Sequence, residues 1–351
     1  MSEFNLQNLV RANVQKLQPY SSARDEYKAS GTEMIFLDAN ENPYENGMNR
    51  YPDPQQRDLK SALAKLKNVK EEQILFGNGS DEVLDLIFRA FCEPGVDNVI
   101  TLPPTYGMYK VLTGINNIEN REVLLTEEFQ LDIKSILKLV DEQTKLLFIC
   151  SPNNPTGNAF DARAIKTILE NFNGIVVIDE AYIDFSSYET WIGFVDLYPN
   201  LIVTQTLSKA YGMAGIRLGI CYASAAIISV LNKIKPPYNV NELTQQKALE
   251  RVLAVDEVFD EVESILEERN RLMIALQEIK FIKEIFPTDA NFVLVKVDDA
   301  NERYQELIEK GIVIRNRTTQ PLCENTLRFT IGTSVENKKL VEALKFLNKE
   351  I

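Results

Sequence analysis

The chain has 351 residues, 38 of them basic and 51 acidic, which gives a formal net charge of −13, and it contains no histidine. The missing imidazoles exclude a Ser-His-Asp triad, a Cys-His pair and a His-ligated metal, and we expect no metal site. The acidic excess argues against nucleic-acid binding, which needs surplus Lys and Arg.

The first residues predict an amphipathic helix rather than a targeting segment. Apolar side chains between Leu6 and Leu17 recur at helical spacing. No stretch approaches the ~18 consecutive apolar residues of a membrane span. We therefore expect a cytoplasmic protein with no membrane contact. The four cysteines form no CxxC pair and lie within or beside apolar stretches, which predicts reduced, packed thiols.

Short apolar runs alternate with helical segments through the first two thirds of the chain. The runs that we predict as buried strands are Val99–Leu102, Lys145–Cys150, Ile175–Ile178, Leu201–Thr204 and Arg217–Tyr222. Amphipathic segments such as Asp81–Phe91 lie between them. This alternation predicts an α/β domain with a doubly wound, mostly parallel sheet.

The pattern changes after the two prolines at 236 and 237. A long charged helical region over about 240–279 comes first. The later segments predict strands at Asn291–Val297, Ile312–Ile314 and Leu327–Ile331, a helix at Ala300–Lys310 and a final helix from Val335. We therefore predict an N-terminal arm over 1–28, a large α/β domain over 29–238 and a small α+β domain over 239–351.

Polar motifs follow three successive predicted strands. They are SPNNPTG at 151–157, DEAY at 179–182 and TLSK at 206–209, the last followed by Arg217 among glycines. Each motif alone has an ordinary explanation: a turn, a helix N-cap or a solvated surface charge. Together, at the carboxyl ends of neighbouring strands, they indicate one functional site.

In this order and combination, these motifs resemble the fold-type I pyridoxal-phosphate-dependent aminotransferases of class I and II, over nearly the whole chain. Further segments resemble the histidinol-phosphate aminotransferases within that class. They are QPYSSAR at 18–24, LDANENPY at 37–44, NRYPDP at 49–54, FGNGSDE at 76–82, PPTYGMY at 103–109 and LRFTIGT at 327–333. The resemblance implies pyridoxal 5'-phosphate as cofactor and a homodimer with a shared active site.

The resemblance also implies a role for each matching residue at the cofactor. Lys209 would bind the cofactor covalently and carry protons, for which its pKa must lie below the usual ~10.4. Asp179 would pair with the protonated pyridine nitrogen, while Tyr182 and Asn154 would bond the phenolic oxygen. Tyr106 would stack on the ring. The phosphate ligands would be Thr206, Ser208, Arg217, the backbone amides of Ser80 and Asp81, and Tyr51 from the neighbouring subunit.

For the substrate, the resemblance implies that Arg328, Arg315 and Tyr20 hold a phosphate group, with Asn154 beside them. A surface salt bridge remains the alternative for Arg315. The implied reaction converts histidinol phosphate and 2-oxoglutarate into imidazole acetol phosphate and glutamate. Three alternatives stay open: an aminotransferase for aromatic amino acids, a threonine-phosphate decarboxylase, and a non-catalytic cofactor-binding protein. The last is disfavoured because a binder need not retain a lysine that transfers protons.

Overall fold

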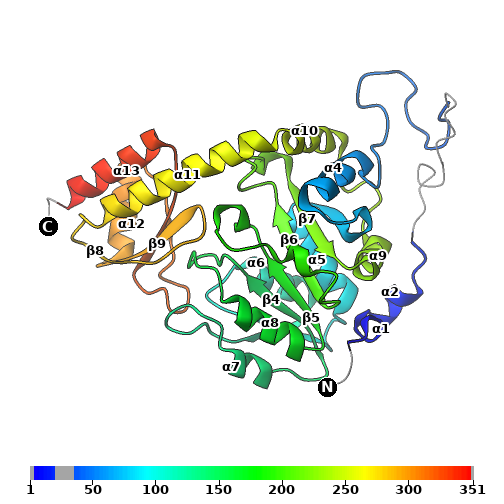
Figure 1. Ribbon diagram of the computed structural model, residues 1–351, viewed down its shortest axis with the longest axis horizontal. Helices are drawn as coiled ribbons and strands as arrows, with labels where there is room; N and C mark the ends of the chain where they lie inside the picture. The colour runs from blue at the N-terminus through cyan, green and yellow to red at the C-terminus, as the bar shows by residue number, and fades with distance from the viewer. Residues whose placement is uncertain (1–3, 20–34, 349–351) are drawn as a thin grey trace.

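The computed structural model describes residues 4–19 and 35–348 of the chain. A large sheet with packed helices forms one part, and a smaller sheet with two helices lies at the other end of the long helix α11, Val255–Leu276 (Figure 1). The predicted fold class, a mostly parallel α/β sheet with a smaller α+β unit, is confirmed. The predicted domain boundaries stay predictions.

The large sheet has seven strands in the order β1-β7-β6-β5-β4-β2-β3. Their bounds are β1 Ile74–Asn78, β2 Asn98–Thr101, β3 Glu119–Glu122, β4 Thr144–Cys150, β5 Ile175–Asp179, β6 Leu201–Thr206 and β7 Leu218–Ala223. Strand β7 runs antiparallel to both of its neighbours, and the other pairings are parallel. The five predicted strands are present, shifted by at most two residues at either end. β1 and β3 were not predicted.

Helices cover both faces of this sheet because its strands alternate apolar side chains between two cores. Along β4, Leu147 and Ile149 face one core, while Leu146 and Phe148 face the other. The first face is covered by α4 Arg57–Lys67, α7 Ile133–Lys138, α8 Ala162–Asn171 and α10 Glu242–Leu253. The second is covered by α5 Ser80–Phe91, α6 Met108–Asn116 and α9 Ala225–Ile234. Short 3-10 turns are η1 Glu71–Gln73, η2 Ile183–Phe185, η3 Trp191–Phe194 and η4 Ala214–Ile216.

The predicted N-terminal helix is two short helices, α1 Leu6–Leu9 and α2 Ala12–Lys16. The chain turns at Arg11, whose amide donates to the carbonyl of Ala90 at 3.0 Å and whose guanidinium binds Glu93. These contacts fasten the turn to the end of α5. The bend lets Leu9, Val10 and Val14 pack into the second core, so tertiary contacts here override the continuous helical pattern.

The small sheet has four antiparallel strands in the order β10-β11-β9-β8. Their bounds are β8 Ile282–Ile285, β9 Phe292–Val297, β10 Arg315–Asn316 and β11 Thr326–Thr330, with helices α12 Ala300–Glu309 and α13 Ser334–Leu347. The strand predicted at Ile312–Ile314 was misplaced. The Ile312 amide instead bonds the carbonyl of Leu307 and closes the end of α12, so pairing begins at Arg315. β8 was not predicted.

All four cysteines are buried and free, as predicted. Burial raises the pKa of the Cys92 and Cys221 thiols, which therefore stay protonated near neutral pH. None of the helices within the described ranges combines the length and apolar character needed to span a bilayer.

Candidate active site

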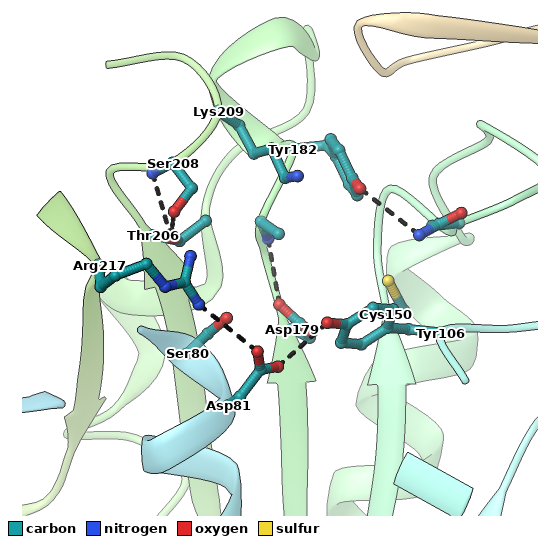
Figure 2. A pocket seen from close by; sticks show the side chains of 12 residues that line it. Ser80, Asp81, Tyr106, Cys150, Asp179, Tyr182, Thr206, Ser208, Lys209 and Arg217 are labelled. Carbon is teal, nitrogen blue, oxygen red and sulfur yellow. Dashed lines mark hydrogen bonds and ion pairs between the residues drawn. The ribbon is translucent and has the colours of Figure 1, made fainter. Parts of the chain in front are cut away.

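The candidate site lies where β4, β5 and β6 end. These strands are parallel, and their register places Asp179 beside Cys150 on one side and Thr204 on the other. Side chains from these strand ends, from the start of α5 and from the loop after β6 converge on one pocket (Figure 2). Its lining is Ser80, Asp81, Tyr106, Cys150, Asn154, Asp179, Ala181, Tyr182, Thr206, Ser208, Lys209 and Arg217. The structure thus brings together every predicted cofactor residue except Tyr51.

Asp179 is the last residue of β5 and only 3% exposed. Its two carboxylate oxygens have different donors: the Ala181 amide bonds Oδ1 at 3.2 Å, and the Tyr109 hydroxyl bonds Oδ2 at 2.8 Å. Burial raises the pKa of Asp179, and both hydrogen bonds oppose that rise. A buried carboxylate with fixed donors is suited to face a cationic ring nitrogen.

Tyr109 is a site residue that the sequence did not reveal. It lies in the first turn of α6, is 1% exposed, and its ring stacks on Phe148 with centroids 5.0 Å apart. Burial, followed by the nearby Asp179 charge, raises its pKa well above the usual value, so its hydroxyl stays a donor. The PPTYGMY motif contains Tyr106 and Tyr109, but their spacing alone does not say which one reaches Asp179.

We expect Tyr109→Phe to lower the free energy of unfolding by about 1.5–3 kcal/mol, because it removes a donor from a buried carboxylate. Tyr222→Phe is the matched control. Tyr222 is equally buried, and its hydroxyl has no hydrogen-bond partner among the described residues. Urea denaturation of both variants measures the difference. Equal losses in the two variants would contradict a stabilising role for the Tyr109–Asp179 bond.

The other end of the pocket presents hydrogen-bond donors. The Ser208 amide donates to the Thr206 hydroxyl at 3.1 Å, and Arg217 lies over the start of α5. This placement requires glycine at position 79, because a Cβ there would lie 2.6 Å from the Arg217 Nη2 atom, and the local φ is +83°. Free amides of a helix N-terminus, hydroxyls and a guanidinium together form a donor set for a phosphate.

Asp81 also lines the pocket, and its side chain links two of its neighbours there. Its carboxylate lies 3.6 Å from the Arg217 guanidinium and accepts the Tyr106 hydroxyl at 3.0 Å. Burial and Asp81 both raise the pKa of Tyr106, which keeps that hydroxyl protonated. The carboxylate therefore links the Arg217 guanidinium to the Tyr106 hydroxyl, an arrangement that the sequence did not indicate.

Lys209 extends from the loop after β6 toward Tyr182 (Figure 2), and its Nζ atom lies 5.6 Å from the Tyr182 ring centroid. Desolvation lowers the pKa of Lys209, and Arg328 and Arg217 lower it further, against the opposing charge of Asp179. This is the direction that the sequence predicted. A larger neutral fraction of the amine favours attack on a carbonyl.

Asn154 connects the pocket to the small sheet. Its Nδ2 atom donates to the Tyr182 hydroxyl at 3.5 Å, and its Oδ1 atom accepts from the Arg328 guanidinium. The Arg328 guanidinium also lies 4.8 Å from the Phe292 ring centroid. Burial, together with the charge of Arg317, lowers the pKa of Arg328 to about 10. Arg328 is therefore a desolvated cation beside the pocket.

The remaining predicted residues lie elsewhere. Arg315 is exposed and pairs in register with Arg328 across β10 and β11. Tyr51 lies outside the pocket, 51% exposed, with its ring stacked on Tyr238 at 4.5 Å. Tyr20 lies outside the described residues. Arg317, which the sequence did not single out, is half-buried near Tyr182.

The pocket fits pyridoxal phosphate by the chemistry of its ends. One end gathers Ser80, Ser208 and Arg217 for a phosphate, with the glycine at position 79 leaving room for the guanidinium. The other end holds the buried Asp179 carboxylate, and the Lys209 amine lies on the same pocket. An anionic group, a basic ring nitrogen and a carbonyl each find a complementary partner.

Comparison with known proteins gives matches over nearly the whole chain. The family model "Aminotransferase class I and II" matches residues 32–344. The histidinol-phosphate aminotransferase of Flavobacterium johnsoniae is 64% identical, over 99% of this chain and 100% of that protein. The crystal structure of the histidinol-phosphate aminotransferase from Clostridium acetobutylicum has a TM-score of 0.80 and 25% identity, covering 87% of this chain and 92% of that one. The Sinorhizobium meliloti histidinol-phosphate aminotransferase, solved in complex with pyridoxal-5'-phosphate, has a TM-score of 0.79 and 24% identity, covering 86% and 83%.

Proposed function

The chain belongs to the class I and II aminotransferase family, and we propose that it transfers the amino group of histidinol phosphate to 2-oxoglutarate with pyridoxal 5'-phosphate. The products are imidazole acetol phosphate and glutamate. The observation that carries the proposal is the pocket that combines the Lys209 amine, the buried Asp179 carboxylate and the phosphate donors of Ser80, Ser208 and Arg217. The names of full-length relatives at 61–64% identity support the substrate.

When bound, pyridoxal phosphate supplies an electron sink for the bonds at the substrate amino carbon. Lys209 would hold the cofactor and would carry the proton that leaves the substrate amino carbon on its Nζ atom; its lowered pKa favours both tasks. Asp179 would place a negative charge opposite the ring nitrogen. Tyr182 and Asn154 would bond the phenolic oxygen, and Tyr106 would limit movement of the ring.

At the substrate end, we propose that Arg328 and Arg315 bind the phosphate group, with Tyr20 from the segment outside the described residues. Arg328 is costly to keep desolvated unless an anion meets it. Its bond to Asn154 places this cation next to a residue that also contacts Tyr182. A substrate phosphate bound here would therefore keep the reacting amine close to the cofactor.

We also propose that the active enzyme is a homodimer, working in the cytoplasm, in which Tyr51 reaches the cofactor phosphate of the neighbouring subunit. Within the segment 35–44, the large apolar side chains of Ile35, Leu37 and Tyr44 are 83%, 86% and 81% exposed, and a second copy would cover them. Tyr51 lies at the end of this segment, outside the pocket of its own chain. A monomeric sedimentation coefficient under assay conditions would contradict the shared site, and recovery in a membrane fraction would contradict the location.

The substrate is tested by steady-state kinetics of the holoenzyme. We expect kcat/KM for histidinol phosphate to exceed that for phenylalanine by about 100-fold or more, because charged hydrogen bonds to the phosphate are lost with phenylalanine. Histidinol phosphate and phenylalanine can be compared as amino-group donors in the same assay, with 2-oxoglutarate as the acceptor. A ratio that favours phenylalanine would assign the enzyme to the aromatic amino acids instead.

The decarboxylase alternative has a different product. A lyase acting on threonine phosphate would release carbon dioxide and need no oxo-acid acceptor. We expect no carbon dioxide from threonine phosphate and a strict requirement for an oxo acid with histidinol phosphate. Turnover without 2-oxoglutarate would support the lyase, and absence of turnover with either substrate would support a non-catalytic binding protein.

A further inference from the structure

The small sheet carries three arginines on one face. Arg315 lies directly opposite Arg328 in the antiparallel pair of β10 and β11, and the Arg317 amide continues this register by donating to the Thr326 carbonyl at 2.9 Å. Paired residues and residues two apart point to the same side of a sheet. The side chains of all three arginines therefore project from one face.

This face is the one directed at the large sheet. Phe292 and Leu294 of β9 lie on the same side as Arg328 and belong to the core that packs against the large sheet. Leu327 and Phe329, on the opposite side, belong to the core of the small unit. The charges of both Arg317 and Arg328 act on Tyr182, which lines the pocket. The alternation of β11 thus presents its charged side to the active site.

Arg317 and Arg328, the two less exposed of these arginines, lack a neutralising carboxylate among the described residues. No carboxylate of the described residues acts electrostatically on Arg317 or Arg328, although the chain as a whole carries 51 acidic residues. The Nε atoms of both are buried without a hydrogen-bond partner among those residues. Desolvation lowers the pKa of Arg317, and Arg315 lowers it further. Like charges held together in this way are costly unless an anion meets them.

A cluster of three arginines favours an anion with two negative charges over an anion with one. A phosphate monoester carries nearly two negative charges at neutral pH, whereas a carboxylate carries one, so Coulomb attraction to the same cations is about twice as large for the phosphate. Guanidinium groups also offer planar pairs of donors that match phosphate oxygens. A third arginine therefore adds more to the binding of a phosphate than to that of a carboxylate.

We infer that Arg317 is a third arginine of the substrate site, one that favours a phosphate dianion over a carboxylate. This inference rests on the proposed function and adds a specificity-determining residue to it. Arg328 bonds Asn154, which lines the pocket, and Arg315 lies directly opposite Arg328. Arg317 lies on the same face, where the electrostatic partners that act on it are Arg315, Tyr182 and Cys323.

The test uses Arg317→Gln in the holoenzyme, with the two half-reactions measured separately. We expect KM for histidinol phosphate to rise about 10- to 100-fold with kcat changed by less than about threefold. KM for glutamate should change by less than about threefold, because its carboxylates carry single charges. Inorganic phosphate should inhibit the wild-type glutamate reaction, and its inhibition constant should rise about 10-fold or more in the variant.

Two comparisons separate substrate recognition from a structural role. Lys283→Gln removes the same charge from an exposed position on β8, at the opposite edge of the small sheet, and should leave all these constants unchanged. The unfolding temperature of Arg317→Gln should stay the same or rise, since repulsion among the arginines is relieved. A lower unfolding temperature with equal losses for both substrates would mean a structural role and overturn the inference.

The outcomes also separate this inference from the proposed function. If wild-type enzyme converts histidinol phosphate and Arg317→Gln does so with an unchanged KM, the inference fails and the function stands. If wild-type enzyme does not convert histidinol phosphate, the proposed function fails. Inhibition by inorganic phosphate still tests Arg317 in that case, and an unchanged inhibition constant would overturn its role.

Discussion

Lys209→Ala is expected to lower kcat by about 10⁴-fold and to remove the visible absorption of covalently bound pyridoxal phosphate. The amine is the group on the pocket whose pKa is lowered by desolvation and by the charges of Arg328 and Arg217. In a chain without histidine, no imidazole can take over the proton transfer. Absorption spectra and single-turnover kinetics with histidinol phosphate measure both effects.

A lysine away from the site provides the control for this variant. Lys247→Ala removes an exposed amine of α10 that pairs with Glu250, and it should retain both the absorption band and turnover. Full activity of Lys209→Ala would refute the assignment of the catalytic lysine. Retained activity with the loss of the absorption band would point to a different proton carrier.

A mixed dimer of two variants tests whether the active site is shared between subunits. If Tyr51 serves the neighbouring subunit, a mixed dimer of Lys209→Ala and Tyr51→Phe contains one site with both native side chains. Co-expression should therefore restore about half of the wild-type activity per such dimer, whereas neither variant alone recovers it. Failure of the mixture to exceed the more active parent would place Tyr51 outside the partner's site.

Much of the large sheet could be predicted because buried parallel strands produce short apolar runs that are easy to recognise. Strands β4, β5 and β6 are of this kind, and each is followed by a polar motif. β3 has the sequence ENRE at the edge of the sheet, with no apolar pattern, and was therefore missed. Its existence depends on pairing with β2, which is a tertiary contact.

The candidate site was predicted where a motif supplies its own residues and missed where two segments meet. Lys209, Asp179 and Arg217 lie in recognisable motifs, and the structure gathers them on one pocket. The bond from Tyr109 to Asp179 joins α6 to β5, and the register of β10 with β11 places Arg317 on the same face as Arg328. Neither arrangement follows from local spacing, because each depends on how separate elements pack.

Asp179→Asn is expected to lower kcat by about 10²- to 10³-fold while the enzyme still binds its cofactor. The amide has nearly the shape of the carboxylate, so the donors at the phosphate end, Ser208 and Arg217, are left in place. The substitution removes the negative charge that we propose keeps the ring nitrogen protonated. KM should change little, since neither Arg328 nor Arg315 is altered. Stopped-flow half-reactions and a cofactor titration separate these effects.

The neighbouring carboxylate provides a matched control for this charge. Glu180 is 1% exposed and is bonded by the Trp191 amide at 2.6 Å and by Gln205 at 2.9 Å, but it does not line the pocket. Burial raises the pKa of Glu180 to about 7, so its charge is already partly neutralised at neutral pH. Glu180→Gln should therefore keep kcat within a few-fold. An equal fall in kcat for Asp179→Asn and Glu180→Gln would mean that either change disturbs the end of β5 in general. A near-native kcat for Asp179→Asn would mean that another group controls the protonation of the ring.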